Sequence, residues 1–184
     1  MNVDKSKLLK WECLARYFLE KRGKILDVIF DNPLCEDEKR NEVLKNLDAK
    51  DSQKKFLLNV FDIDYIYIQN NKPILIEGKM KNIESKRFHE GNYVYLHHGT
   101  RTQYKHLKEA YELGIEAGIL LRCAKFKQAP EGLLGYAMAD PEYVEYEESK
   151  FYPIQNCEYL PLSKQTKIPV DDFIKRMRKK ARKQ

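Results

Sequence analysis

Apolar residues at helical and strand spacing predict a helix, a strand and a second helix in residues 1–50. Residues 6–22 have an apolar stripe at helical spacing and are closed by Gly23, a common residue just after a helix. Residues 24–30 (KILDVIF) are few and rich in β-branched side chains, which favours a strand. Residues 36–50 are highly charged and predict an exposed helix. The residues of this helix that should face the core are Val43, Leu44 and Leu47.

Two apolar, β-rich runs between residues 56 and 81 flank Asn70 and Asn71, and this pattern predicts a hairpin. Asparagine tolerates the positive φ that a tight two-residue turn requires. If these two residues form the whole turn, the pairing of the two strands is fixed. A turn one residue longer would give every strand residue a different partner.

The second half of the chain predicts a loop, a helix and a buried strand. Residues 83–99 are polar, aromatic and irregular, which is typical of a loop or a mobile flap. Residues 102–113 predict a helix that ends at Gly114. Residues 117–123 (AGILLRC) form a continuous apolar run, which is typical of a strand buried on both faces.

The final third predicts short strands and one amphipathic helix. Aromatic segments at 132–146 and 151–162 contain turn signals at Asp140-Pro141 and Tyr152-Pro153, so we expect short strands there. Pro169 and Asp171 are typical of a helix start. The apolar face of that helix, which must dock on the body, consists of Val170, Phe173, Ile174 and Met177.

This order of elements predicts one α/β domain over residues 1–184, with a mixed central sheet flanked by helices. The core should cover about residues 6–124, and the C-terminal strands and basic helix residues 132–184. A length of 184 residues with 42% hydrophobic residues suits one folded domain and argues against disorder.

Membrane and secretory classes do not fit the sequence. No apolar run approaches the roughly 18 residues that span a bilayer, and the first residues do not resemble a signal peptide. We therefore expect a cytoplasmic protein. The cysteines lie far apart without a CxxC pair, which argues against a zinc ribbon and favours free, mostly buried thiols; a disulfide would fit only a hyperthermophile source. They are Cys13, Cys35, Cys123 and Cys157.

The net charge of +6 is concentrated at the C-terminus, because residues 175–184 contain seven basic residues and no acidic one. Subtracting these seven charges from +6 leaves −1 for the rest of the chain. A basic segment on a near-neutral body favours polyanions such as nucleic acids. The alternative is a solubilising tail. Candidate phosphate-binding residues in this segment are Arg176, Lys179 and Lys180.

The predicted hairpin register brings charged side chains together. Asp64 would lie opposite Glu77, and Asp62 opposite Lys79. Two opposed carboxylates within apolar strands destabilise a sheet unless a cation lies between them or one carboxyl is protonated. Hard cations such as Mg²⁺ select carboxylates, waters and phosphate oxygens. The alternative is an ordinary set of cross-strand ion pairs on a solvated face.

The pattern D-x12-E-x-K on a hairpin, formed by Asp64, Glu77 and Lys79, resembles the PD-(D/E)XK nuclease superfamily. Over about residues 6–123 the chain looks most like archaeal Holliday-junction resolvases and related viral or RecB-like nucleases. The resemblance implies a restriction-endonuclease-like core (αβββαβ). It also implies that the Asp and Glu bind Mg²⁺ or Mn²⁺ and that the Lys assists the attacking water. Two departures are Ile63 where the motif has proline, and Asp62 as a second candidate metal ligand.

The resemblance also gives roles to residues outside the hairpin. A glutamate on the first helix completes the metal site in the family, which makes Glu12 a candidate ligand; it could instead pair with Arg16. A glutamine near the active site corresponds to Gln103, although Thr100 and Gln103 also fit a capping box.

Further cations lie close to these candidates. Arg101 and Lys105 flank Gln103 and could hold DNA phosphates. Arg87 stands among aromatic residues, a mixture suited to stacking on unpaired bases or to packing the loop.

The sequence therefore predicts an Mg²⁺- or Mn²⁺-dependent endonuclease that hydrolyses DNA phosphodiester bonds in duplex or branched DNA. Homodimerisation is implied by the resolvase-like relatives. One alternative is a non-catalytic nucleic-acid-binding protein on a nuclease fold. Another is a protein-interaction module whose hairpin charges form only ion pairs.

Overall fold

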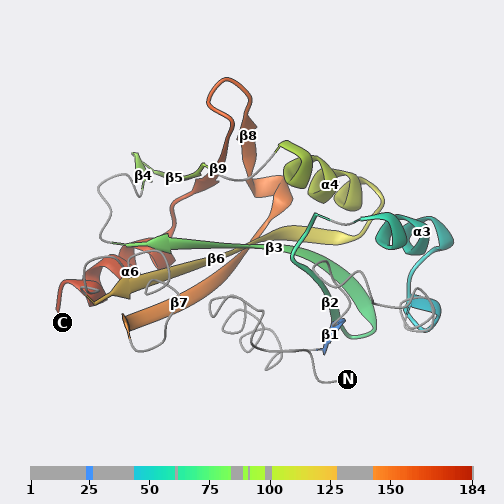
Figure 1. Ribbon diagram of the computed structural model, residues 1–184, viewed down its shortest axis with the longest axis horizontal. Helices are drawn as coiled ribbons and strands as arrows, with labels where there is room; N and C mark the ends of the chain where they lie inside the picture. Colours follow the sequence, from blue (N-terminus) through green and yellow to red (C-terminus); the bar gives the residue numbers. More distant parts are fainter. Residues whose placement is uncertain are drawn as a thin grey trace.

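The computed structural model describes residues 24–26, 44–60, 62–83, 89–90, 92–97, 101–127 and 143–183, and shows two β-sheets with α-helices packed against them (Figure 1). The predictions for residues 6–22, 27–30, 36–43 and 132–142 lie outside this part of the chain. In chain order the described elements are β1 (Lys24–Leu26), α3 (Asp51–Asn59), β2 (Tyr65–Gln69), β3 (Lys72–Asn82), β4 (His89–Glu90), β5 (Tyr93–Leu96), α4 (Arg101–Glu112), β6 (Glu116–Phe126), β7 (Val144–Pro153), η2 (Ile154–Asn156), β8 (Glu158–Leu160), β9 (Gln165–Pro169) and α6 (Asp172–Ala181).

The larger sheet has the strand order β1-β2-β3-β6-β7 and is mixed, as the sequence predicts. Strands β1, β2 and β3 form an antiparallel meander, and α4 then crosses over to β6, which is parallel to β3. Strand β7 returns antiparallel to β6. The parallel pair places β3 and β6 at the centre of the sheet, where both faces are covered.

The β2–β3 hairpin has the predicted turn and register. Asn70 and Asn71 adopt φ values of 50° and 62°, the left-handed conformation that a two-residue type I′ turn requires. The strands pair from Gln69 with Lys72 to Tyr65 with Ile76. Extended by one step, this register places residue 64 opposite residue 77.

Strand β6 is buried along nearly its whole length, which confirms the prediction from its apolar run. Gly118 is required there because β7 approaches closely. A Cβ atom at Gly118 would lie 2.2 Å from the Tyr152 carbonyl oxygen and 2.6 Å from the Phe151 ring. The absence of a side chain thus lets the aromatic end of β7 pack flat against β6.

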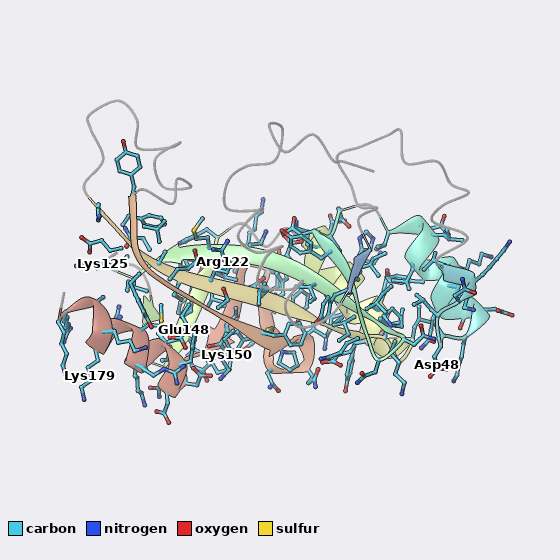
Figure 2. All side chains as sticks on the ribbon, turned by 90° about the horizontal axis from the view of Figure 1, so that it is seen from below. Asp48, Arg122, Lys125, Glu148, Lys150 and Lys179 are labelled. Atoms are coloured by element: carbon cyan, nitrogen blue, oxygen red, sulfur yellow. The ribbon has the colours of Figure 1, made fainter. Side chains whose placement is uncertain are left out.

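The two faces of the larger sheet have different partners. On one face, Ile119 and Leu121 share a core with Leu107 of α4 and Met177 of α6. Figure 2 shows α6 lying along one side of the sheet. The other face holds a second, aromatic-rich cluster: Tyr65, Tyr67, Ile74, Ile76 and Leu120, with Phe151 packed against it. The face covered by α4 and α6 is the one that holds the candidate site.

The smaller sheet, with the order β4-β5-β9-β8, corrects the prediction of a loop over residues 83–99. Within the described part of that segment, β5 shows a strand pattern in which Val94 and Leu96 are buried. Its partner β9 lies about 70 residues later in the chain, so this pairing has no local sequence signal. The β8–β9 hairpin projects beyond the body of the molecule (Figure 1).

The start of the first β-rich run was also predicted wrongly, because residues 56–59 belong to helix α3. The Lys50 amide donates to Gln53 Oε1 (2.7 Å) and thereby closes the first turn of α3. Leu57 is fully buried, so an apolar run that resembles a strand is here one face of a short helix. Leu44 and Leu47 are buried as predicted, but the helix predicted to reach residue 50 is already a turn by Asn46.

The remaining helices agree with the sequence. α4 is followed by Gly114 in the left-handed conformation (φ 80°), as expected just after a helix. Asp171 caps α6 by accepting hydrogen bonds from the amides of Phe173 and Ile174. Phe173, Ile174 and Met177 are buried, so the apolar face of α6 docks as predicted. Within the described ranges, no helix combines the length and apolarity needed to cross a bilayer.

Candidate functional site

Asp64 and Glu77 lie side by side at the end of the β2–β3 hairpin, on the face of the sheet covered by α4. The Asp64 amide donates to Glu77 Oε2 (3.2 Å), and the Gly78 amide donates to Asp64 Oδ2 (2.7 Å). Each carboxylate is therefore held by the backbone of the opposite strand. The sequence-based prediction that these two acidic residues meet is confirmed.

Glu77 is 2% exposed, which is unusual for a carboxylate unless it is paired or binds a metal. Lys79 Nζ lies 2.5 Å from Glu77 Oε1. The Gln103 side chain donates to the same oxygen through Nε2 (2.7 Å), and its Oε1 accepts from Lys79 Nζ (3.3 Å). The three side chains thus form a closed triangle of hydrogen bonds around one buried carboxylate.

Burial raises the pKa of Glu77 to about 7, and the neighbouring Asp64 carboxylate adds to the rise. The charge and hydrogen bond of Lys79 act in the opposite direction but do not cancel these effects. Without a further positive charge, Glu77 therefore holds a proton up to near-neutral pH. Binding of a divalent cation between the carboxylates would favour the ionised form.

Helix α4 fixes the segment before β2 through two contacts one helical turn apart. Gln103 Nε2 donates to the Asp62 carbonyl oxygen (3.2 Å), and His106 Nδ1 contacts Asp62 Oδ1. The carboxylate of Asp62 is thus bound by His106, and this contact replaces the predicted cross-strand pairing with Lys79. His106 was missed from the sequence, although it lies three residues after Gln103 on the same side of the helix.

Among the described residues, the carboxylates of Asp64 and Glu77 are the pair that lies together at this site. In the part of the chain that the structure describes, no group of three or more His, Cys, Asp and Glu residues is placed to hold an ion. Two carboxylates completed by waters and substrate oxygens are what Mg²⁺ selects, so the pair fits such an ion. The predicted third ligand, Glu12, lies outside the described residues.

The predicted phosphate-binding cations have different surroundings. Arg101 and Lys105 are exposed on α4, where Lys105 also pairs with Glu109 (3.5 Å). Arg87 lies outside the described residues. On the C-terminal helix, Arg176 is bound to Glu148 of β7 (2.5 Å). Its sequence-based role as a DNA contact therefore competes with a structural ion pair.

Other cations of α6 extend the basic surface. Lys180 lies over the Tyr146 ring (5.1 Å to the centroid), and both Lys179 and Lys180 are exposed. Figure 2 shows Glu148 and Lys150 on β7 beside α6, and Lys179 near the end of that helix. Part of the basic segment thus binds the body, and part remains accessible to solvent.

Two of the four cysteines lie in described parts of the chain. Cys123 and Cys157 are both free and buried, which agrees with the prediction of free, mostly buried thiols. Cys13 and Cys35 lie outside the described residues.

Comparisons with models of known protein families, with curated protein sequences and with solved structures give no match for this chain.

Proposed function

We propose that this protein is a metal-dependent endonuclease of the PD-(D/E)XK type, which hydrolyses DNA phosphodiester bonds with Mg²⁺ or Mn²⁺. The observation that carries the proposal is the buried Glu77 carboxylate beside Asp64, with Lys79 and Gln103 bound to it. A meander of three strands followed by a helical crossover to a parallel strand is the topology expected after the first helix of a restriction-endonuclease-like core. The succession β1, β2, β3, α4 and β6 supports this assignment.

In this proposal Asp64 and Glu77 hold the cation. The site binds a divalent cation because the two negative charges lie close together. The backbone amides of Asp64 and Gly78 fix one oxygen of each carboxylate, so little reorganisation is needed on binding. A divalent cation supplies charge neutralisation on the phosphate and lowers the pKa of a bound water.

Lys79 acts beside the reacting phosphate. Its Nζ lies between Glu77 Oε1 and Gln103 Oε1, so the charge stays at one position next to the carboxylates. From there it stabilises negative charge that builds on the phosphate and orients the attacking water. Gln103 holds both Glu77 and Lys79 and ties them to Asp62, so α4 keeps the site assembled.

The DNA backbone would be held by cations around the site and on α6. Arg101 and Lys105 on α4 and Lys179 on α6 are exposed and suited to phosphate contacts. A branched substrate that is cut on two strands needs two sites, so the proposal includes a homodimer.

The test is cleavage of labelled four-way junction, flap, nicked duplex, linear duplex and single strand, each with Mg²⁺, Mn²⁺ or EDTA. We expect metal-dependent cutting by the full chain, and its loss in Glu77→Ala and Lys79→Ala. Binding of nucleic acid without cutting in either metal would favour the alternative, a non-catalytic binding protein on this fold. If the chain neither binds nor cuts any of these substrates, the proposal is overturned.

A further inference from the structure

The turn between β8 and β9, residues 161–164, carries a leucine at the tip of a hairpin. Leu162 is 103% exposed, more than any other large apolar residue described. Figure 1 shows that its hairpin stands away from the body, beside the start of α4. A fully exposed leucine contributes nothing to folding, because burial of such a side chain is worth about 1.5–3 kcal/mol and here none of it is realised.

The hairpin that carries Leu162 is firmly anchored at its base. Thr166 and Ile168 of β9 are buried, and β9 pairs on both sides, with β5 and with β8. In the turn, Ser163 Oγ donates to the Leu160 carbonyl oxygen (3.3 Å), and Lys164 adopts φ 50°. The tip is thus a short, defined turn on a fixed pair of strands.

The base of the hairpin is joined directly to the helix that completes the candidate catalytic site. The Tyr159 ring of β8 packs on the Tyr104 ring of α4 (centroids 5.7 Å apart). The Tyr104 hydroxyl donates to the Cys157 carbonyl oxygen (3.0 Å). Tyr104 directly follows Gln103, which binds Glu77 and Lys79. The leucine therefore has a fixed position relative to the carboxylate pair.

We propose that Leu162 is a wedge that enters the base stack of double-stranded nucleic acid at a branch or nick while the neighbouring strand lies in the catalytic site. This inference rests on the proposed nuclease function and narrows its substrate to duplexes with an interruption. Apolar side chains on nucleic-acid-binding proteins insert between base steps and kink the duplex. Unstacking costs least where pairing is already interrupted, which favours a branch or nick over continuous duplex.

The surroundings of the tip favour a polyanion over a second copy of the chain. Lys164 in the same turn is exposed, so a cation lies two residues from the leucine. A stable protein interface buries about 800 Å² on each partner, far more than one leucine supplies. A single apolar side chain with a cation beside it suits a base step between phosphates.

The experiment uses a nicked duplex and a four-way junction with 2-aminopurine next to the interruption, because unstacking of this base raises its fluorescence. Lys79→Met is the background for binding, so that the strand stays intact. We expect binding of the Lys79→Met variant to raise the fluorescence. Addition of Leu162→Ala to this variant should abolish the rise and weaken binding of interrupted duplex about tenfold. Leu113→Ala is the matched control, since Leu113 is also an exposed leucine (37%) and should change neither measurement.

The outcomes separate this inference from the proposed function. If Lys79-dependent cutting occurs but Leu162→Ala behaves as the unmodified chain on interrupted duplex, the wedge is wrong and the nuclease stands. A change of oligomeric state in Leu162→Ala without a change in fluorescence would instead assign the tip to a second copy. If no nucleic acid is bound at all, both ideas fall together.

Discussion

The carboxylates of Asp64 and Glu77 are interlocked across the hairpin, since each accepts a hydrogen bond from the backbone of the strand that carries the other. The two distances are 3.2 Å, from the Asp64 amide to Glu77 Oε2, and 2.7 Å, from the Gly78 amide to Asp64 Oδ2. This arrangement fixes two acidic groups next to each other, which is unfavourable when both are ionised. Burial and the neighbouring Asp64 carboxylate therefore raise the pKa of Glu77 to about 7. Rigid strands that hold two carboxylates in this unfavourable arrangement are typical of catalytic or metal-binding sites.

Replacement of Lys79 by Met should separate metal binding from catalysis. Lys79 lowers the pKa of Glu77, so its loss raises that pKa further and strengthens proton competition with the metal near pH 7. We expect weaker Mn²⁺ binding near neutral pH that recovers above about pH 8, and cleavage reduced about 10²- to 10³-fold throughout. Calorimetric Mn²⁺ titration and single-turnover cleavage at several pH values measure the two effects. Recovery of cleavage together with metal binding at high pH would remove Lys79 from the chemical step.

Replacement of Gln103 by Ala should loosen the site without emptying it. The variant lacks the donor to Glu77 Oε1 (2.7 Å) and to the Asp62 carbonyl oxygen (3.2 Å). We expect a loss of about 10- to 100-fold in Mn²⁺ affinity or activity, the range found for groups that orient metal ligands. Gln165→Ala, which removes a glutamine contact to His97 on the smaller sheet, is the control and should leave both unchanged. If the two variants behave alike, Gln103 contributes to helix α4 and not to the metal site.

The stability of the metal-free protein should depend on pH through Glu77. The pKa of this carboxyl rises from 4.5 to about 7 on folding, so between these values the folded chain holds a proton that the unfolded chain has released. The free energy of unfolding therefore falls as pH rises through this window, by at most about 3 kcal/mol, and levels off above it.

Urea unfolding in EDTA between about pH 5 and about pH 8 measures this dependence, with Glu77→Gln as the reference. The variant lacks the Glu77 titration and keeps that of every group that does not interact with Glu77. We expect the stability difference between the two proteins to change across the window. Parallel curves would show that Glu77 titrates normally in the folded state.

The local parts of the fold could be predicted from the sequence. Asn70 and Asn71 determine the hairpin turn, and the turn determines the register that brings residues 64 and 77 together. The apolar run of β6 and the left-handed Gly114 after α4 are equally local signals. For this reason the sequence alone predicts the carboxylate pair and the place of Lys79 beside it.

The parts of the fold that depend on contacts between distant segments could not be predicted from the sequence. His106 binds Asp62 across 44 residues, and no periodicity in either segment indicates that pairing. Strand β5 depends on β9, so the local sequence of its four residues predicts only a loop. Arg176 likewise binds Glu148 because α6 docks on β7. A residue that was predicted to bind DNA phosphates therefore forms an ion pair within the protein.

Calorimetric titration of Mn²⁺ into the metal-free full chain, beside Asp64→Asn, Glu77→Gln and the matched control Asp62→Asn, tests the central claim most directly. The carboxylates of Asp64 and Glu77 lie together, whereas that of Asp62 is bound to His106. We predict a saturable site in the unmodified chain that is retained in Asp62→Asn and lost in the other two variants. No Mn²⁺ binding by the unmodified chain, or equal binding by all four proteins, would contradict the assignment of a metal site to this hairpin.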